Sequence, residues 1–171
     1  MTRMATSWTI SPEPVDDATV DDVMRQYFTE IGQRVFGRTA TDAELRAVLT
    51  EDPHHDLAPP NGQFLVARGA DREFLGCVGL RLLGTAPGTA ELKRMYVHPA
   101  GRGAGLGRGL LLAGEEAARR LGAERIVCET NTQLTEARAL YTRYGYQETE
   151  PYEGHGRADH WYAKSVAPAA S

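Results

Sequence analysis

The sequence predicts a single α/β domain with a mixed sheet of six to seven strands and about four helices. Strand-like runs separated by short turns between residues 64 and 97 indicate an antiparallel meander. A strand, a helix and a second strand follow over residues 91–130, and such a crossover makes the two strands parallel. The 171 residues, 42% of them hydrophobic, are enough for one sizeable core.

The N-terminal segment is predicted to contain a short strand and then a long helix. Residues 7–10 are the candidate first strand, which the proline at Pro12 would end. Over residues 20–35, apolar side chains recur at three- and four-residue spacing, which is typical of one helix face. Asp16 or Asp17 is the candidate N-cap of this helix.

A second, shorter helix is predicted to begin at Thr41, because Glu44 completes a capping box three residues later. Residues 52–62 are rich in proline and contain Asn-Gly, so they are expected to form a loop. Two strands, residues 64–68 and 74–83, follow with a short turn between them, which indicates a hairpin. Each of the two helices has an apolar face that must pack against a larger apolar surface, and the sheet is the candidate for that surface.

The centre of the chain combines a strand, a glycine-rich turn and a helix. A strand begins at Glu91 and stops before Pro99, because proline cannot continue a ladder. Apolar residues at helical spacing occupy residues 106–121, and a buried strand is expected over residues 125–130.

The C-terminal part is predicted to hold one helix and two strands. The helix covers residues 135–144 and ends at Gly145. Strands are expected over residues 146–150 and 159–166, and residues 167–171 are expected to form a disordered tail.

Five glycines alternate through residues 101–109, directly between a strand and a helix. This geometry directs backbone N–H groups and a helix N-terminus at one place, which suits a phosphate group. No register of these glycines gives G-x-G-x-x-G, and the loop contains no lysine, so neither a dinucleotide fingerprint nor a nucleoside-triphosphate loop is present. The alternative is that this glycine-rich segment only connects the strand to the helix and binds no ligand.

Two sequence blocks resemble the signatures of the GNAT N-acetyltransferase superfamily. The first matches Arg-x-x-Gly-x-Gly, the form of the acetyl-CoA-binding segment, and reads Arg102-Gly103-Ala104-Gly105-Leu106-Gly107. The second runs from Ala137 through Leu140-Tyr141 to Gly145-Tyr146. The resemblance covers residues 8–166, and it implies a single-domain fold in which two central parallel strands splay apart around the pantetheine of acetyl-CoA.

The resemblance also implies which residues bind the coenzyme. A backbone N–H near Tyr96 or Val97 would polarise the thioester carbonyl, as it does in this family. Asn131 would replace an asparagine that many members carry where this chain has Leu134. The complete set of expected coenzyme contacts is Met95, Tyr96, Val97, Arg102, Gly103, Ala104, Gly105, Leu106, Gly107, Arg108, Asn131 and Tyr141.

Acetyl transfer to an amine needs a proton acceptor, because an alkylammonium has a pKa of roughly 10.4 and must lose a proton before it attacks. Glu91 is the candidate base by its spacing to Arg102, with Glu129 or water as alternatives. Tyr141 is the candidate acid that protonates the departing thiolate, through its place in the second block. The alternatives to these roles are that Glu91 is a solvated glutamate at the start of a strand, and that Tyr141 is only a packed aromatic side chain.

Composition narrows the partners and the compartment. The net charge of −4 argues against nucleic acid or an anionic membrane as the main partner. The N-terminus has no apolar leader, and no apolar run is long enough to span a bilayer, so a cytoplasmic location is expected. The protein could also form a homodimer. Cys77 and Cys128 are expected to be buried free thiols. The five histidines show no metal-ligand spacing, so no metal is expected.

The expected function is acetyl transfer from acetyl-CoA to a small cationic amine. This acceptor class follows from an excess of acidic residues near the expected acceptor side, namely Glu51, Asp52, Asp56, Glu148, Glu150, Glu153 and Asp159. Alternatives are a protein or peptide amine as acceptor, and a non-catalytic acyl-CoA sensor. A nucleotide-binding α/β module is a more distant alternative.

Overall fold

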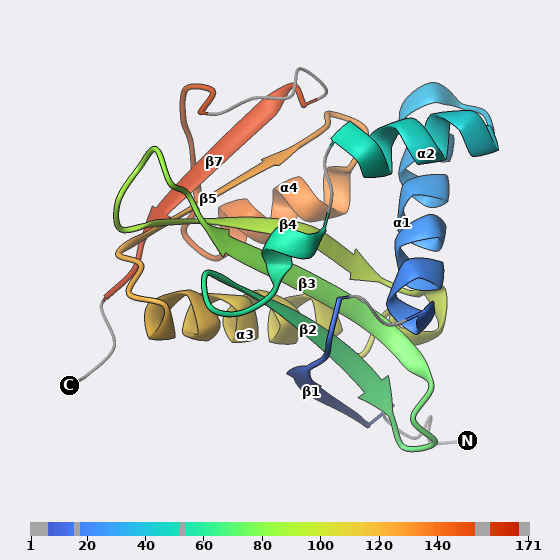
Figure 1. Ribbon diagram of the computed structural model, residues 1–171, viewed down its shortest axis with the longest axis horizontal. Helices are drawn as coiled ribbons and strands as arrows, with labels where there is room; N and C mark the ends of the chain where they lie inside the picture. The colour runs from blue at the N-terminus through green and yellow to red at the C-terminus, as the bar shows by residue number, and fades with distance from the viewer. Residues whose placement is uncertain (1–6, 16–17, 52–53, 153–157, 168–171) are drawn as a thin grey trace.

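The computed structural model describes residues 7–15, 18–51, 54–152 and 158–167 (Figure 1). Its strands form one seven-stranded sheet in the order β1-β2-β3-β4-β5-β7-β6. The strands are β1 (Trp8–Pro12), β2 (Gly62–Gly69), β3 (Phe74–Leu82), β4 (Thr89–Val97), β5 (Arg125–Thr130), β6 (Gln147–Glu148) and β7 (His160–Ser165). The helices are α1 (Ala18–Phe36), α2 (Asp42–Glu51), α3 (Leu106–Arg120) and α4 (Thr135–Arg143), with short 3-10 turns η1 (His55–Leu57) and η2 (Pro99–Gly101).

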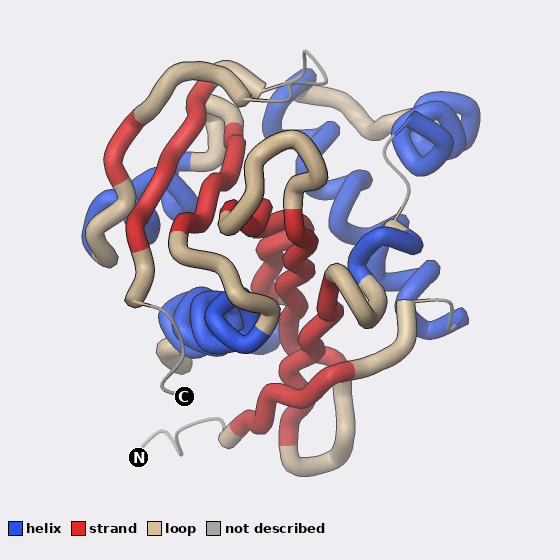
Figure 2. Tube along the Cα trace, turned by 60° about the vertical axis from the view of Figure 1, so that its left-hand side comes forward, coloured by secondary structure: helices blue, strands red, loops and turns tan. Residues whose placement is uncertain are grey.

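The predicted mixed sheet is confirmed. Strands β2, β3 and β4 form an antiparallel meander, and β5 pairs with β4 in parallel after the α3 crossover. Helices lie on both sides of the strands (Figure 2). Side chains of α3 and α4 pack in one apolar cluster, and side chains of α1 pack in a second cluster that includes Phe64 and Val66 of β2.

Most element boundaries agree with the sequence patterns, and the exceptions have local causes. The first strand continues through Pro12, which pairs with Leu65. Proline is tolerated there because β1 is an edge strand, where a missing N–H leaves no ladder bond unmade. The penultimate strand is shorter than expected and contains only Gln147 and Glu148. The proposed caps Asp16 and Asp17, and residues 168–171 of the proposed tail, lie outside the described residues.

The capping box at the start of α2 is confirmed. The Glu44 N–H donates to Thr41 Oγ1 at 3.2 Å, and the Thr41 N–H donates to Glu44 Oε2 at 2.8 Å. Arg38 adds two bonds to the same carboxylate, at 2.6 and 3.0 Å. These hydrogen bonds, first of all those from Arg38, lower the pKa of Glu44 to about 2.

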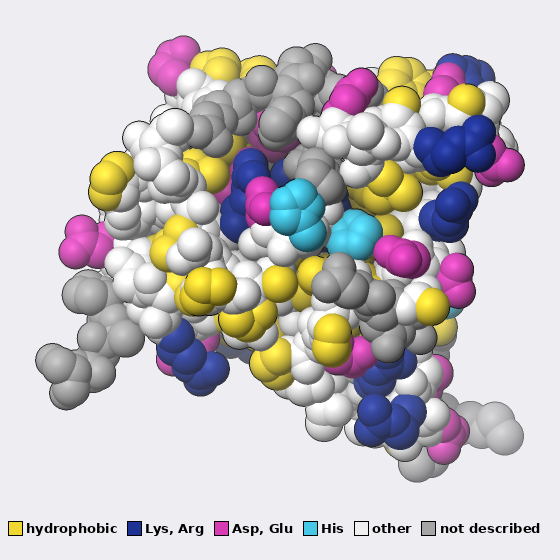
Figure 3. Space-filling model, viewed as in Figure 1, with side chains coloured by type: hydrophobic (Ala, Val, Ile, Leu, Met, Phe, Trp, Pro, Cys, Tyr) yellow, Lys and Arg dark blue, Asp and Glu magenta, His cyan; other side chains and the backbone are white. Residues whose placement is uncertain are grey.

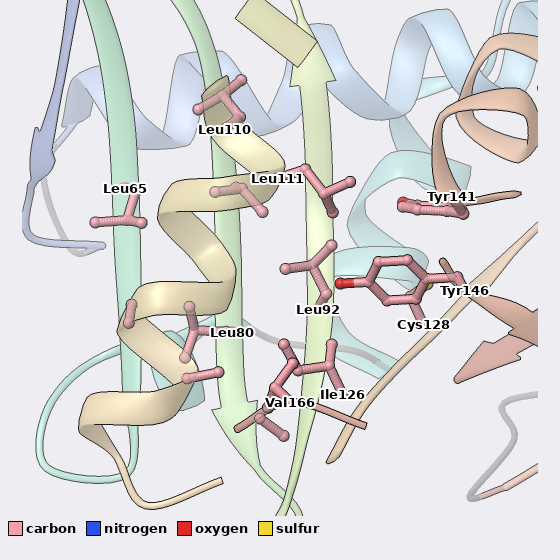
Figure 4. Close-up of a cluster of buried hydrophobic side chains, with 14 of the residues drawn as sticks. Leu65, Leu80, Leu92, Leu110, Leu111, Ile126, Cys128, Tyr141, Tyr146 and Val166 are labelled. Carbon is pink, nitrogen blue, oxygen red and sulfur yellow. The ribbon is translucent and has the colours of Figure 1, made fainter. Parts of the chain in front are cut away.

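The main core lies between α3 and the sheet, as Figure 4 shows. Leu110 and Leu111 of α3 are fully buried together with Leu80 of β3. The close contact of helix and sheet depends on Gly114, because a Cβ there would lie 2.8 Å from a methyl carbon of Leu92. Cys77 and Cys128 are both buried and free, as expected.

A buried carboxylate sits at the edge of this core. Glu115 of α3 is 2% exposed. Its Oε1 accepts hydrogen bonds from Tyr146 Oη at 3.1 Å and from Lys164 Nζ at 2.9 Å. The neighbouring Glu116 is exposed and pairs only loosely with Arg119 and Arg120.

Glu115→Ala is expected to lower the free energy of unfolding by about 3 kcal/mol, because it leaves the Lys164 ammonium and the buried Tyr146 hydroxyl without their acceptor. Glu116→Ala, one position along the same helix, is expected to cost about 0.5 kcal/mol or less. Urea unfolding of the two variants measures both values. Equal losses would show that the buried network contributes nothing beyond helix propensity.

Candidate active site

The two central parallel strands separate soon after they pair. In the described residues the β4–β5 ladder joins only Thr89–Glu91 to Arg125–Val127. Beyond these pairs the strands diverge towards α1 and α2 (Figure 1). One edge of β4 from Leu92 onward therefore faces a gap instead of a neighbouring strand. The predicted splay is present, and its backbone N–H and C=O groups are available to a ligand that lies along the strand.

A β-bulge shapes β4 inside this gap. On β3 the register advances from Cys77 to Gly79, while on β4 the partners are Tyr96 and Lys93. One extra residue is thus inserted in β4, and Arg94 takes a left-handed φ of 56°. Cys77 Sγ donates to the Arg94 carbonyl at 3.2 Å and supports the bulge. No sequence signal marks it, because arginine has no preference for positive φ.

The glycine-rich loop ends β4 and leads into α3. Gly103 and Gly105 have φ values of 81° and 72°, which explains why glycine occupies both positions. The first turn of α3 has N–H groups without intrahelical acceptors, and they point out of the helix at this loop. Trp8 of β1 anchors the loop, because its indole Nε1 donates to the Ala104 carbonyl at 3.0 Å. No local sequence pattern predicts this contact.

Helix α1 contacts both sides of the gap through ion pairs. Glu30 pairs with Arg102, the first residue of the glycine loop motif, whose Nε also donates to the Val97 carbonyl at 3.2 Å. One turn later Arg34 contacts Glu136, at the start of α4, at 2.6 Å. These pairs place the C-terminal half of α1 across the opening between β4 and β5.

A cavity of about 420 Å³ lies under this part of α1. It is lined by residues of α1, α2, β4, β5 and α4. Of the residues proposed from the sequence as base, acid or coenzyme contacts, Met95, Glu129, Asn131 and Tyr141 lie in its wall. Tyr96 and Val97 continue β4 towards the loop of residues 102–108, where the remaining expected coenzyme contacts are found.

Glu91 lies at the point where the strands begin to separate. It is 1% exposed, and its Oε1 accepts from Arg81 Nε at 2.9 Å. Arg81 also contacts Asp56 in η1 at 3.2 Å. Charged and histidine side chains gather over η1 at the centre of the face in Figure 3. Glu91 is thus a buried member of a charged network, whereas Glu129 lines the cavity itself.

Tyr141 occupies the cavity wall on the α4 side and is 4% exposed. Its ring packs against Tyr146 and Tyr162, with centroid distances of 5.5 and 5.7 Å. Cys128 lies beside it in the core (Figure 4). Burial raises the pKa of Tyr141 well above its ordinary value of 10.0, so the phenol keeps its proton at neutral pH.

Tyr152, which no sequence motif marks, also approaches the carboxylates. Its hydroxyl is buried and lies close to the Glu91 carboxylate. Burial raises the pKa of Tyr152, and the nearby charges of Glu91 and Glu129 raise it further. Tyr152 thus brings a protonated phenol next to both candidate bases. The tyrosine follows β6 in an irregular segment, so no periodic pattern marked it.

The acidic residues expected near the acceptor mostly have protein partners. Asp56 pairs with Arg81, Glu148 contacts His160, and Asp159 accepts from Thr132 at 2.8 and 2.9 Å. Of this set Glu51 lines the cavity, and Asp52 and Glu153 lie outside the described residues. His155 is also undescribed, and the described residues contain no group of three or more potential metal ligands.

Comparison with known proteins identifies the family. The model of the Acetyltransferase (GNAT) family matches residues 21–146. The chain belongs to the GNAT acetyltransferase family. An uncharacterized N-acetyltransferase of Schizosaccharomyces pombe is 34% identical over 141 residues, which cover 82% of this chain and 81% of that protein. An IAA acetyltransferase of Azospirillum brasilense is 37% identical over 100 residues, 58% of this chain and 64% of that protein.

Solved structures of GNAT proteins share the fold. PaiA N-acetyltransferase from Thermoplasma acidophilum, in complex with coenzyme A, superposes with a TM-score of 0.70 at 19% identity over 94% of this chain and 99% of that one. Its family membership makes this protein an acyltransferase, and GNAT acetyltransferases use acetyl-CoA as cosubstrate. Among the described residues, no helix is long and apolar enough to cross a membrane.

Proposed function

We propose that this GNAT protein transfers the acetyl group of acetyl-CoA directly to a primary amine of a small molecule. The observation that carries the proposal is the gap between β4 and β5, which lies between the glycine loop at the start of α3 and the cavity. Such a gap can hold an extended pantetheine arm with its phosphates at the loop and its thioester at the cavity. A small-molecule acceptor also agrees with a relative named aminoglycoside N(6')-acetyltransferase from Stenotrophomonas maltophilia, 29% identical over 106 residues.

The coenzyme contacts are assigned to three segments. The backbone of residues 102–108 would bind the pyrophosphate, supported by the N-terminus of α3. Met95, Tyr96 and Val97 would lie along the pantetheine, with a backbone N–H of this segment directed at the thioester carbonyl. Asn131 would contact the coenzyme from the β5 side.

The chemistry requires one proton to leave the amine and one to reach the sulfur. The neutral nitrogen attacks the carbonyl carbon, a C–N bond forms, and the C–S bond breaks with coenzyme A as the leaving thiol. We assign the base to Glu91, which is buried and would receive the proton through water. Glu129 is the alternative base, and it lines the cavity. Tyr141 would protonate the sulfur.

In Glu91→Gln, kcat/KM for the amine is expected to fall by about 10²-fold at neutral pH. The loss should disappear as the pH approaches about 10.4, because the free amine then needs no base. Glutamine keeps an oxygen for Arg81, so the melting temperature should change little. The pH profile of kcat/KM and thermal unfolding give the two measurements.

Glu129→Gln, measured in the same pH series, is the matched comparison. A normal profile for Glu91→Gln with a depressed one for Glu129→Gln would transfer the base to Glu129. Normal profiles for both variants would leave water as the proton acceptor.

The function itself is tested by acetyl-CoA-dependent release of thiol over a broad panel of primary amines. We expect amine-dependent release and mass-spectrometric detection of the N-acetyl product. Tight binding of acetyl-CoA without transfer to any amine would contradict the proposal and favour a sensor.

A further inference from the structure

The cavity has an apolar wall on the helix side. Seven large apolar or aromatic side chains come from α1 and α2, and they are Tyr27, Phe28, Ile31, Val35, Phe36, Leu45 and Val48. A sugar placed against these side chains would bury most of its hydroxyl groups without hydrogen-bond partners, which costs free energy. An acceptor with an apolar body gains from the same wall, at roughly 25 cal/mol per Å² of apolar surface removed from water.

The strand side of the cavity is charged. Lys93 and Arg94 come from β4, and Glu129 comes from β5 across the gap. Arg94 is 5% exposed, and its guanidinium lies 4.7 Å from the Phe28 ring centroid. A guanidinium has five N–H donors, so it can bind a carboxylate while it keeps contacts to the protein. Cations and an anion therefore face one cavity from opposite strands.

A further charged pair lines the cavity away from the two strands. Arg38 and Glu44 hold each other through two hydrogen bonds at the α1–α2 end. The cavity thus has a mostly apolar wall on the helices, with Glu51 at the end of α2, positive charge on β4 and negative charge on β5. This arrangement complements a molecule with an apolar side group, a carboxylate and an amine on one small centre.

We propose that the acceptor is an α-amino acid with a large apolar side chain, held by its carboxylate at Arg94 with its amine beside Glu129. This inference rests on the proposed acetyltransferase function and selects its substrate class. The amine nitrogen forms the C–N bond to the acetyl carbon, the C–S bond breaks, and the products are an N-acetyl amino acid and the coenzyme A thiol. The cavity, about 420 Å³, lies within the size range of small-molecule sites.

The test compares L-phenylalanine with phenethylamine, which lacks only the carboxylate, and with spermidine and kanamycin. With acetyl-CoA and the wild-type protein, kcat/KM is expected to be about 10- to 100-fold higher for L-phenylalanine than for phenethylamine. Arg94→Gln should remove this preference, so that the ratio of the two kcat/KM values falls to about one. Arg94→Lys should restore part of the preference, because it keeps the charge without the fork of donors.

Arg46→Gln is the matched control, since Arg46 is an exposed arginine of α2 outside the cavity lining. It should behave as wild type with both amines. Equal turnover of L-phenylalanine and phenethylamine, or better turnover of spermidine or kanamycin, would overturn the amino-acid proposal while the acetyltransferase function stands.

Product binding supplies a readout that does not need turnover. Calorimetry with N-acetyl-L-phenylalanine and N-acetylphenethylamine should show tighter binding of the first, and Arg94→Gln should abolish the difference. If no amine releases thiol, the proposed function fails, and this titration still decides the ligand site. Equal affinities for the two products would overturn the site.

Discussion

Gly105→Glu is expected to weaken acetyl-CoA binding at least about 100-fold while the protein stays folded. Gly105 precedes the first residue of α3 with φ at 72°, and a Cβ there would meet no atom within 4 Å. The new side chain therefore has room to extend, but it brings a negative charge to the place proposed for the pyrophosphate. Like charges at a helix N-terminus remove the attraction that the loop would otherwise supply.

The opposite end of the same helix provides the control. Gly122 has φ at 89°, and a Cβ there also meets no atom within 4 Å. Gly122→Glu thus carries the same left-handed backbone strain, about 1–2 kcal/mol, without touching the loop. Calorimetric titration with acetyl-CoA and thermal unfolding of both variants separate binding from folding. Equal coenzyme affinities in the two proteins would refute the assignment of the loop.

The order of the elements could be predicted because local chemistry marks nearly every boundary. Pro99 stops β4, Thr41 and Glu44 start α2, and the short turn after residue 68 allows only a hairpin. The parallel β4–β5 pair follows from the handedness and length of a crossover. These signals act over a few residues, so one sequence is sufficient to read them.

The walls of the site could be predicted only in part, because periodicity does not distinguish a core from a ligand cavity. The apolar stripe of α1 predicts one buried face. In the structure Val23 and Met24 fill the second core cluster, while Ile31 and Val35, on the same stripe, line the cavity. Which half meets the sheet depends on where β4 and β5 separate, and no residue of α1 encodes that.

Contacts between distant segments could likewise not be predicted from the sequence. The Trp8 bond to Ala104 and the Glu30 pair with Arg102 join residues far apart in the chain. The expected cationic acceptor depended on acidic residues, yet Asp56 and Glu148 have protein partners outside the cavity lining. A count of charges along the chain gives no information on which of them pair after folding.

Tyr141→Phe is expected to lower kcat by about 10²–10⁴-fold with little change in acetyl-CoA affinity. A thiolate leaving inside a dry cavity costs far more than in water, so a proton delivered as the C–S bond breaks lowers the barrier. Tyr141 lines the cavity, and its raised pKa keeps the proton on the phenol throughout the neutral range. Because that pKa is raised, ionisation of Tyr141 should cause no fall in activity below pH 10.

Tyr146→Phe separates catalysis from packing. The two rings are neighbours, with centroids 5.5 Å apart, and phenylalanine preserves the ring in each variant. The Tyr146 hydroxyl donates to buried Glu115, so its removal should lower stability by about 1–3 kcal/mol and leave kcat near the wild-type value. Tyr141→Phe should show the opposite pattern, a large loss of kcat at a nearly constant melting temperature. A kcat within about threefold of wild type in Tyr141→Phe would end its assignment as the acid.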